Sequence, residues 1–217
     1  MGLVRHYAAA GWSVLATCRA PESARQLQAL ARERPGRVEI RFLSVTEPDE
    51  IEDLGRTLDD RPLDLLVNNA GVRGKGASTL GSIDPGSFLH AMEVNALGAL
   101  KVTEALLPNL RRAEEPLVVM MSSSLGSLAR NEEGGDYAYR ASKAAMNAVM
   151  RSLAADLKKD RIAVISIHPG WVRTDMGGDH ARLSVEESVS AMRRVLDGVS
   201  FADTGRFLRW DGREEPW

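Results

Sequence analysis

The sequence predicts an α/β fold of the doubly wound type, in which one parallel β-sheet lies between two layers of helices. Strand-like and helix-like segments alternate along the whole chain, and most strand-like segments are apolar throughout, as in "PLVVMMSS" and "IAVISIHPG". Strands buried on both faces have this composition, and alternation with helices gives parallel pairing. The 217 residues fit one Rossmann-type domain that spans residues 1–217.

Each expected element has a local signal. Apolar residues recur at helical spacing in the expected helices, Gly11 suits the end of the first, and the Ser-x-x-Glu start at Ser184 suits the last. The expected helices cover residues 3–10, 21–34, 47–58, 85–112, 137–159 and 184–199. The expected strands cover residues 12–18, 37–45, 63–71, 116–123, 162–170 and 206–210.

Composition limits the classes of function. The formal net charge is −2 and no block of Lys and Arg stands out, which argues against nucleic acid or an anionic membrane as the main partner. No apolar run has the length of a membrane span. Cys18 is the single cysteine and cannot form an internal disulfide, so we expect a cytoplasmic protein in which Cys18 is a small buried side chain.

In doubly wound sheets, ligands bind where the strands end at their carboxyl edge, so the chemistry is expected just after Cys18, Val67, Met121 and Ile167. Tyr139 and Lys143 stand four residues apart in the expected helix that follows one of these strand ends. This spacing places them on one helix face, where an ammonium favours the phenolate and lowers the pKa of the phenol. A surface pair of no catalytic role is the alternative.

Further polar residues stand at strand ends or inside helices. One hydroxyl of Ser122, Ser123 and Ser124 can hold a substrate carbonyl oxygen, although the same serines can merely satisfy the end of their strand. Asn95 lies among apolar residues inside a long helix, which indicates a buried amide or a local kink. His168 has no second His or Cys at ligand spacing, so a packed histidine is expected and no metal site.

Five segments in order, "NNAG", "VNALG", "SSSLG", "YAYRASKAA" and "HPGWVRTDM", resemble the short-chain dehydrogenase/reductase family. The stretches "LGSLARNEEGGDYAYRASK", "HPGWVRTDMGG" and "WDGREEPW" resemble its sniffer-type carbonyl reductase and C-factor subgroup. The resemblance covers nearly the whole chain. It implies an NAD(P)-dependent oxidoreductase that acts on a small carbonyl or alcohol substrate.

The resemblance also implies roles for single residues. Ser123, Tyr139, Lys143 and Asn95 would form a catalytic tetrad, with Tyr139 as general acid, Ser123 holding the carbonyl oxygen and Asn95 holding a water in a proton relay. The interval from Ser123 to Tyr139 is longer than in many members. Cofactor contacts would come from Gly2, Asn68, Ala70, Gly71, Tyr139, Lys143, Pro169, Gly170 and Thr174.

Arg19 follows the strand whose end usually carries an acid in NAD-preferring proteins. A cation there would attract a 2′-phosphate by charge-assisted hydrogen bonds, so NADP(H) is the expected cofactor and NAD(H) the alternative. A solvated loop arginine is the other interpretation. Two positions depart from the family pattern: Ser44 replaces an Asp that contacts adenine, and Met120 replaces a frequent Asn.

The start of the chain shows the largest departure from the family pattern. The family begins with a strand and a Gly-rich turn that binds the pyrophosphate, and here Gly2 matches only the last glycine of that turn. We therefore expect an N-terminally shortened chain that lacks the first, central strand. The strands at Val14 and Leu65 would then expose unpaired inner edges, and cofactor binding would be impaired until upstream residues are restored.

The leading functional prediction is an NADPH-dependent carbonyl reductase with a short lid from Trp171 to Val185 and a hinge at Gly177 and Gly178. A dinucleotide-binding signalling or scaffold protein of the C-factor type and an inactive fragment are the alternatives. The helices around Leu97 and Met146 carry small residues that can pack across a homodimer axis or on their own sheet.

Overall fold

The computed structural model describes residues 1–76 and 78–217. Its strands form two parallel sheets, one of order β1-β2 and one of order β3-β4-β5-β6. The strands are β1 (Val14–Cys18), β2 (Val38–Phe42), β3 (Leu65–Asn68), β4 (Leu117–Met121), β5 (Ala163–His168) and β6 (Phe207–Arg209). Each expected strand is therefore confirmed, and no observed end lies more than three residues inside the expected one.

Helices connect the strands throughout the described chain. The α-helices are α1 (Gly2–Ala9), α2 (Arg25–Glu33), α3 (Pro48–Leu58), α4 (Pro85–Met92), α5 (Gly98–Ala105), α6 (Leu107–Leu110), α7 (Tyr137–Asp156) and α8 (Val185–Asp197). Shorter turns are η1 (Pro21–Ser23), the π-helix η2 (Glu93–Leu97), η3 (Ser124–Gly126), η4 (Leu157–Asp160) and η5 (Phe201–Asp203). No helix among the described residues is long and apolar enough to span a bilayer.

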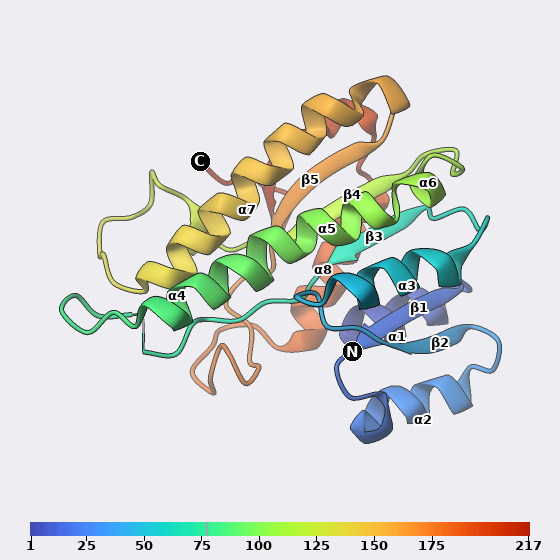
Figure 1. Cartoon of the computed structure of the whole chain (residues 1–217), viewed down its shortest axis with the longest axis horizontal. Helices are drawn as coiled ribbons and strands as arrows, with labels where there is room; N and C mark the ends of the chain where they lie inside the picture. Colours follow the sequence, from blue (N-terminus) through green and yellow to red (C-terminus); the bar gives the residue numbers. More distant parts are fainter. Residues whose placement is uncertain (77) are drawn as a thin grey trace.

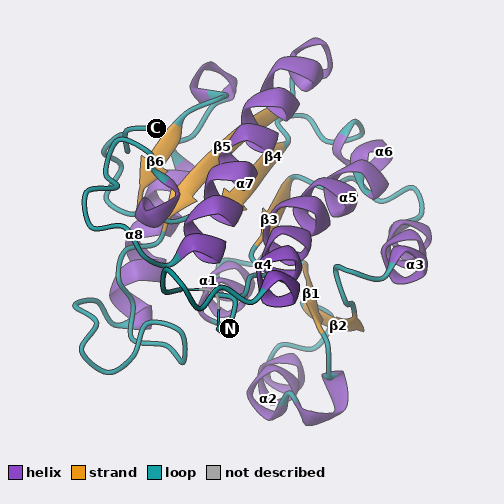
Figure 2. Ribbon diagram, turned by 60° about the vertical axis from the view of Figure 1, so that its left-hand side comes forward, coloured by secondary structure: helices purple, strands orange, loops and turns teal. Residues whose placement is uncertain are grey.

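The four-stranded sheet is covered on both faces, as expected. Figures 1 and 2 show α4, α5 and α7 on one side and α1 and α8 on the other. Alternate residues of β4 explain this arrangement: Val118 and Met120 pack with Met146 of α7, whereas Val119 packs with Met192 of α8. All five residues of β4 are buried, which is why its sequence has no polar face.

The two sheets meet at the inner edges of β1 and β3, which the sequence predicts to be unpaired. β1 pairs with β2 and β3 pairs with β4, and the described residues form no ladder between β1 and β3. Figures 1 and 2 show the β1-β2 pair beside the β3 edge of the larger sheet.

The long helix expected over residues 85–112 is interrupted, which corrects the prediction. It consists of α4, the π-turn η2 and α5, and a break at Leu106 precedes α6. Pro108 stands in the first turn of α6, where its missing N–H favours a new start over continuation of the helix. The π-turn contains Asn95, whose side chain carries the site geometry described next.

The parallel register aligns three strand ends. Asn68 at the end of β3 is level with Met120, and Met121 at the end of β4 is level with Ile167 of β5. The residues that follow β3, β4 and β5 therefore meet at one edge of the sheet.

Candidate active site

Tyr139 and Lys143 occupy the first two turns of α7 and share one face, as their spacing predicts. The Lys143 Nζ atom lies 5.8 Å from the centroid of the Tyr139 ring and donates a hydrogen bond of 2.7 Å to the carbonyl oxygen of Met121. Lys143 is only 3% exposed, and this burial lowers its pKa to about 8. Helix α7 is thus tied to the end of β4 through a buried amine.

The pKa of Tyr139 is raised, which reverses the expected direction. Burial is the largest cause, while the neighbouring side chain of Ser123 and the charge of Arg73 act in the opposite sense. The ammonium of Lys143 is directed at the Met121 carbonyl. In this structure burial therefore outweighs the nearby positive charge, and the phenol keeps its proton at neutral pH.

Ser123 and Ser122 differ in where their hydroxyls lie. Ser123 lies beside Tyr139 and begins the turn η3, where its Oγ accepts a hydrogen bond of 3.2 Å from the Leu125 N–H. Ser122 Oγ instead donates a bond of 2.7 Å to Asn147 inside the core. Of these two hydroxyls, that of Ser123 lies beside Tyr139.

Asn95 is fully buried and connects the turn after β3 to α7. Its amide oxygen accepts a bond from the Val72 N–H and its amide nitrogen donates to the Val72 carbonyl, both at 2.8 Å. The same nitrogen donates to Ser142 Oγ at 2.7 Å, and that hydroxyl donates to the Tyr139 carbonyl. The π-turn thus aims Asn95 at the turn after β3 and links it to the Tyr139 backbone.

The cofactor residues expected after β3 lie at this same place. A Cβ atom at Gly71 would lie 3.2 Å from the Asn95 oxygen and 3.4 Å from Lys143 Nζ, so glycine allows the main chain to approach both. Asn68 is buried and donates a bond of 3.0 Å to Thr103 in α5, and Ala70 is exposed.

The cofactor residues expected after β5 differ in their surroundings. Pro169 is held by a bond of 2.6 Å from Ser188 of α8 to its carbonyl, and Gly170 has φ of +88°. Thr174 is exposed in the following loop. The carboxyl end of β5 is therefore rigid, whereas the loop beyond it faces solvent.

Gly2 and Arg19 lie apart from the Tyr139 cluster. Gly2 is in the first turn of α1, where a Cβ atom would lie 2.7 Å from a methyl group of Val189 in α8. Arg19 is exposed directly after β1. The structure places neither residue in contact with the tetrad.

Sequence reasoning missed three residues of this site. Arg73 and Asp136 form a two-pronged ion pair, with distances of 3.1 and 2.7 Å, next to Tyr139. They are 63 residues apart, so no local pattern predicts the pair. Ser142 had a readable signal, since it stands three residues after Tyr139 inside the motif "YRASK".

The layered α/β fold and the grouping of Tyr139, Lys143, Ser123 and Asn95 at the carboxyl edge of its sheet are those expected of an oxidoreductase that uses a dinucleotide. The chain belongs to the short chain dehydrogenase family, whose profile matches residues 1–182.

Individual relatives agree with this membership. The C-signal protein of Myxococcus xanthus is 46% identical over 156 residues, which cover 72% of this chain and 93% of that protein. The carbonyl reductase Sniffer of D. melanogaster superimposes with a TM-score of 0.91 at 30% identity, covering 100% of this chain and 94% of the other. An NADPH-bound carbonyl reductase from chicken fatty liver gives a TM-score of 0.92 at 34% identity, covering 100% and 93%.

Proposed function

We propose that this protein is an NADPH-dependent carbonyl reductase in which Tyr139 acts as general acid. The observation that carries the proposal is the half-buried phenol of Tyr139, whose raised pKa keeps it protonated, beside the hydroxyl of Ser123. The similarity to carbonyl reductases, one of them NADPH-bound, supports the choice of substrate class and cofactor.

The described residues fit the nicotinamide end of such a cofactor. Gly71 gives close main-chain access beside Lys143, and Pro169 and Gly170 stand at the end of β5. Arg19 is an exposed cation at the end of β1, where it suits a 2′-phosphate. When bound, the reduced nicotinamide supplies the hydride.

The chain supplies the proton and holds the substrate oxygen. The raised pKa keeps Tyr139 protonated at neutral pH, so its O–H can donate to a carbonyl oxygen as negative charge develops there. Ser123 Oγ donates a second hydrogen bond to that oxygen and stabilises the same charge. Lys143 keeps its main-chain bond to Met121 and presents its remaining N–H donors beside Gly71.

Asn95 contributes to the proton relay by holding a water molecule. Both of its N–H donors are bonded, to Val72 and to Ser142, and its oxygen already accepts one bond. A carboxamide oxygen accepts two, so Asn95 retains one acceptor site for a relay water.

The loop from Trp171 to Val185 forms a lid over small apolar substrates in this proposal. Its base is closed by main-chain bonds of 2.8 Å from Arg173 to Leu183 and 3.0 Å from Leu183 to Trp171. The Trp171 indole donates 2.8 Å to the Gly177 carbonyl, so the two halves of the loop are cross-linked. Small aldehydes and ketones suit the apolar wall that Trp171 provides.

The test compares Tyr139→Phe with Tyr137→Phe, which removes an exposed hydroxyl from the same helix. NADPH oxidation is followed with a panel of aldehydes and ketones, and NADPH binding by fluorescence. We expect Tyr139→Phe to lower kcat by at least about 100-fold with cofactor affinity unchanged, and Tyr137→Phe to behave as wild type. Normal turnover by Tyr139→Phe, or a wild type inert toward the whole panel, would overturn the proposal.

A signalling or scaffold role is the second candidate, and the 46% identity to C-signal favours it. It predicts NADPH binding without turnover of any carbonyl in the panel. The Tyr139→Phe variant would then retain full biological signalling.

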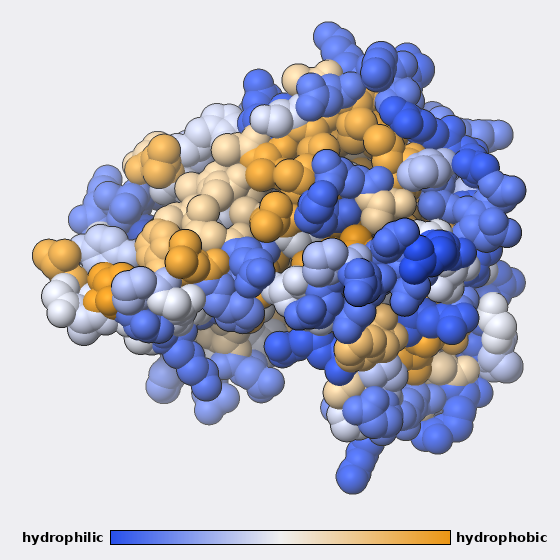
Figure 3. Space-filling model, viewed as in Figure 1, coloured by the Kyte–Doolittle hydropathy of each residue, from blue (hydrophilic) through white to orange (hydrophobic). Residues whose placement is uncertain are grey.

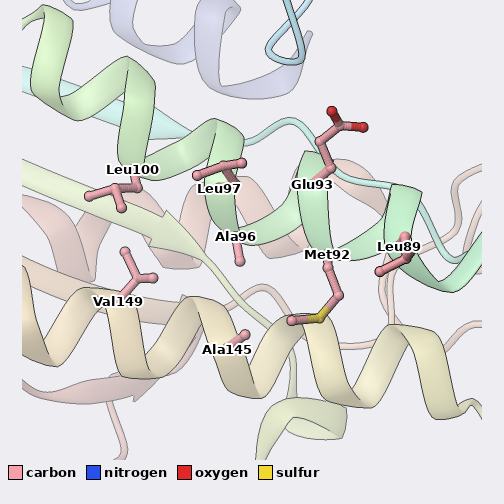
Figure 4. Close-up of a pocket in the computed structure, with 8 residues that line it drawn as sticks. All are labelled: Leu89, Met92, Glu93, Ala96, Leu97, Leu100, Ala145 and Val149. Atoms are coloured by element: carbon pink, nitrogen blue, oxygen red, sulfur yellow. The ribbon is translucent and has the colours of Figure 1, made fainter.

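We also propose that the face formed by α4, η2, α5 and α7 binds a second copy of the chain. Figure 3 shows an apolar band across this face, and Figure 4 shows the side chains that line a groove on it. The groove has a volume of about 570 Å³. The groove is lined by Leu89, Met92, Glu93, Ala96, Leu97, Leu100, Ala145 and Val149. Leu89 is 67% exposed and Leu97 is 51% exposed, and both line this apolar groove.

The charges on this face are complementary to those of a copy related by a two-fold axis at Leu97. Glu93 and Lys101 lie four residues on either side of Leu97. Antiparallel pairing at Leu97 therefore brings opposite charges together across the axis. Sedimentation should show a dimer that Glu93→Lys weakens and Glu93→Lys/Lys101→Glu restores, and a wild-type monomer at about 100 μM would refute it.

The single cysteine leads us to propose the cytoplasm as the compartment of this protein. Fractionation of the producing cells with an antibody against the chain tests this assignment.

A further inference from the structure

The C-terminal residues fold back along the last strand of the sheet. Main-chain bonds of 2.8 Å run from Arg209 N–H to the Arg213 carbonyl and from Glu215 N–H to the Phe207 carbonyl. The Trp217 ring packs on Phe207 with centroids 5.5 Å apart. Residues 211–217, here called the C-terminal tail, are thus fixed to β6.

The same tail contacts the segment that follows Ser123. Arg130 Nε lies 2.7 Å from a carboxylate oxygen of Glu215, and the Ala129 N–H donates a bond of 2.8 Å to the main-chain oxygen of Trp217. Residues 128–130 are otherwise exposed. These two contacts attach an outer loop to the tail.

Glu215 is held in an unusual position for a carboxylate. Its side chain is 1% exposed, and a second arginine, Arg209, lies 3.9 Å away. A buried carboxylate is tolerated only when it is paired, so the charge of Glu215 requires these arginines. Burial, with smaller contributions from Arg209 and Arg130, lowers the pKa of the nearby His168 to about 4, so His168 is neutral.

A continuous set of turns connects Arg130 to Ser123. The Arg130 N–H donates to Ser127 Oγ at 3.3 Å, the Ser127 N–H to the Ser124 carbonyl at 3.1 Å, and the Gly126 N–H to the Ser123 carbonyl at 2.9 Å. At Gly126 the segment presses against α7, since a Cβ atom there would lie 2.9 Å from the Lys143 backbone. The segment 123–130, here called the serine segment, is therefore held between α7 and the tail.

We propose that Glu215 and Arg130 are positioning residues, through which the C-terminal tail holds the serine segment so that Ser123 Oγ stays beside Tyr139. The inference rests on the proposed reductase function, because it assigns the pair a role in the geometry of that site. Neither side chain touches substrate. Their effect is on how well Ser123 and Tyr139 are aligned when the carbonyl oxygen is bound.

The test uses Glu215→Gln, with Glu214→Gln as its matched control. Glu214 is the adjacent carboxylate of the same tail, but it is 63% exposed and pairs with Arg206, outside the serine segment. We expect Glu215→Gln to lower kcat by about tenfold or more, with KM and NADPH affinity changed less than about threefold. Glu214→Gln should match wild type in all three.

A second pair of variants covers the case in which Glu215→Gln does not fold. Arg130 is 47% exposed, so Arg130→Gln removes no core side chain, and Arg209 remains near the Glu215 carboxylate in this variant. This variant should show the same selective loss of kcat, and Arg130→Lys, which retains the charge, should recover most of it. A purely structural ion pair would instead lower the melting temperature while leaving kcat of the folded enzyme unchanged, and that result would overturn the inference.

Amide hydrogen exchange separates this inference from the proposed function. Loss of the pair should speed exchange at Gly126 and Ser127, whose N–H groups are bonded within the serine segment. If wild type exchanges slowly there, Glu215→Gln exchanges faster, and no carbonyl is reduced, the reductase function fails while the tail still holds the segment. If wild type reduces carbonyls and Glu215→Gln equals Glu214→Gln in kcat and exchange, the inference fails and the function stands.

Discussion

Asn95 and Val72 are joined by a reciprocal pair of 2.8 Å hydrogen bonds, in which the side-chain amide of Asn95 mimics a backbone partner for the turn after β3. The pairing is made inside the π-turn η2 and also reaches Ser142 of α7. Three elements that are distant in the sequence therefore meet on one carboxamide. This explains why an asparagine is placed inside an apolar helix that disfavours it.

Replacing Asn95 with Ala should destabilise the protein by about 3 kcal/mol, because it leaves the partly buried Val72 amide groups and Ser142 without their partner. Urea unfolding measures the change. Asn131→Ala is the control, since Asn131 is exposed and caps only a surface turn, and its effect should stay within about 0.5 kcal/mol. Equal effects of the two substitutions would show that Asn95 is not a structural link.

Lys143 should make stability depend on alkaline pH. Burial lowers its pKa to about 8 from an ordinary 10.5, so between these values the unfolded chain binds more protons than the folded one. Stability must then rise with pH in this window, and below pH 8 the contribution is flat. From pH 7 to pH 10, wild type should gain about 2 kcal/mol relative to Lys143→Met.

Denaturant unfolding at a series of pH values measures this gain. Lys159→Met, which removes an exposed ammonium, is the matched control and should follow the wild-type curve. A constant difference between wild type and Lys143→Met across pH 7 to 10 would contradict the buried, perturbed amine.

Much of the fold was predictable because its signals are local. The uniformly apolar sequence of β4 predicts a strand covered on both faces. The spacing of Ser184 and Glu187 predicts the capping box that begins α8. The carboxyl-edge rule then placed the Tyr139 helix next to Ser123 without any coordinates.

What could not be predicted depends on distant or collective effects. The π-turn changes the helical register by one residue over Glu93–Leu97, which hydrophobic periodicity does not resolve. The Arg73–Asp136 pair joins residues 63 apart. The direction of the Tyr139 pKa shift followed from the balance between burial and nearby charge, and a sequence shows only the charge.

Arg19→Asp should discriminate between the two dinucleotides. An exposed guanidinium at the end of β1 would bind a 2′-phosphate by charge-assisted hydrogen bonds, and their loss should weaken NADPH binding by about 30-fold or more. NADH affinity should change by less than about threefold, as NADH has no such phosphate. Titration calorimetry with both cofactors decides this, with Arg34→Asp as the control at another exposed arginine. Equal losses for NADPH and NADH would remove Arg19 from the binding site.

Gly170 and Gly178 form a matched pair for testing how the lid is anchored. Both have positive φ, +88° and +72°, so an alanine at either position costs about 1–2 kcal/mol of backbone strain. At Gly178 a Cβ atom would meet open space, whereas at Gly170 it would collide with Leu183 and lie 2.9 Å from the Trp210 ring. Gly170→Ala should therefore cost at least about 1 kcal/mol more than Gly178→Ala in thermal unfolding, and should also lower substrate affinity because Leu183 closes the base of the lid. If the two alanine variants lose the same stability, the contact between Gly170 and Leu183 does not make the base of the lid rigid.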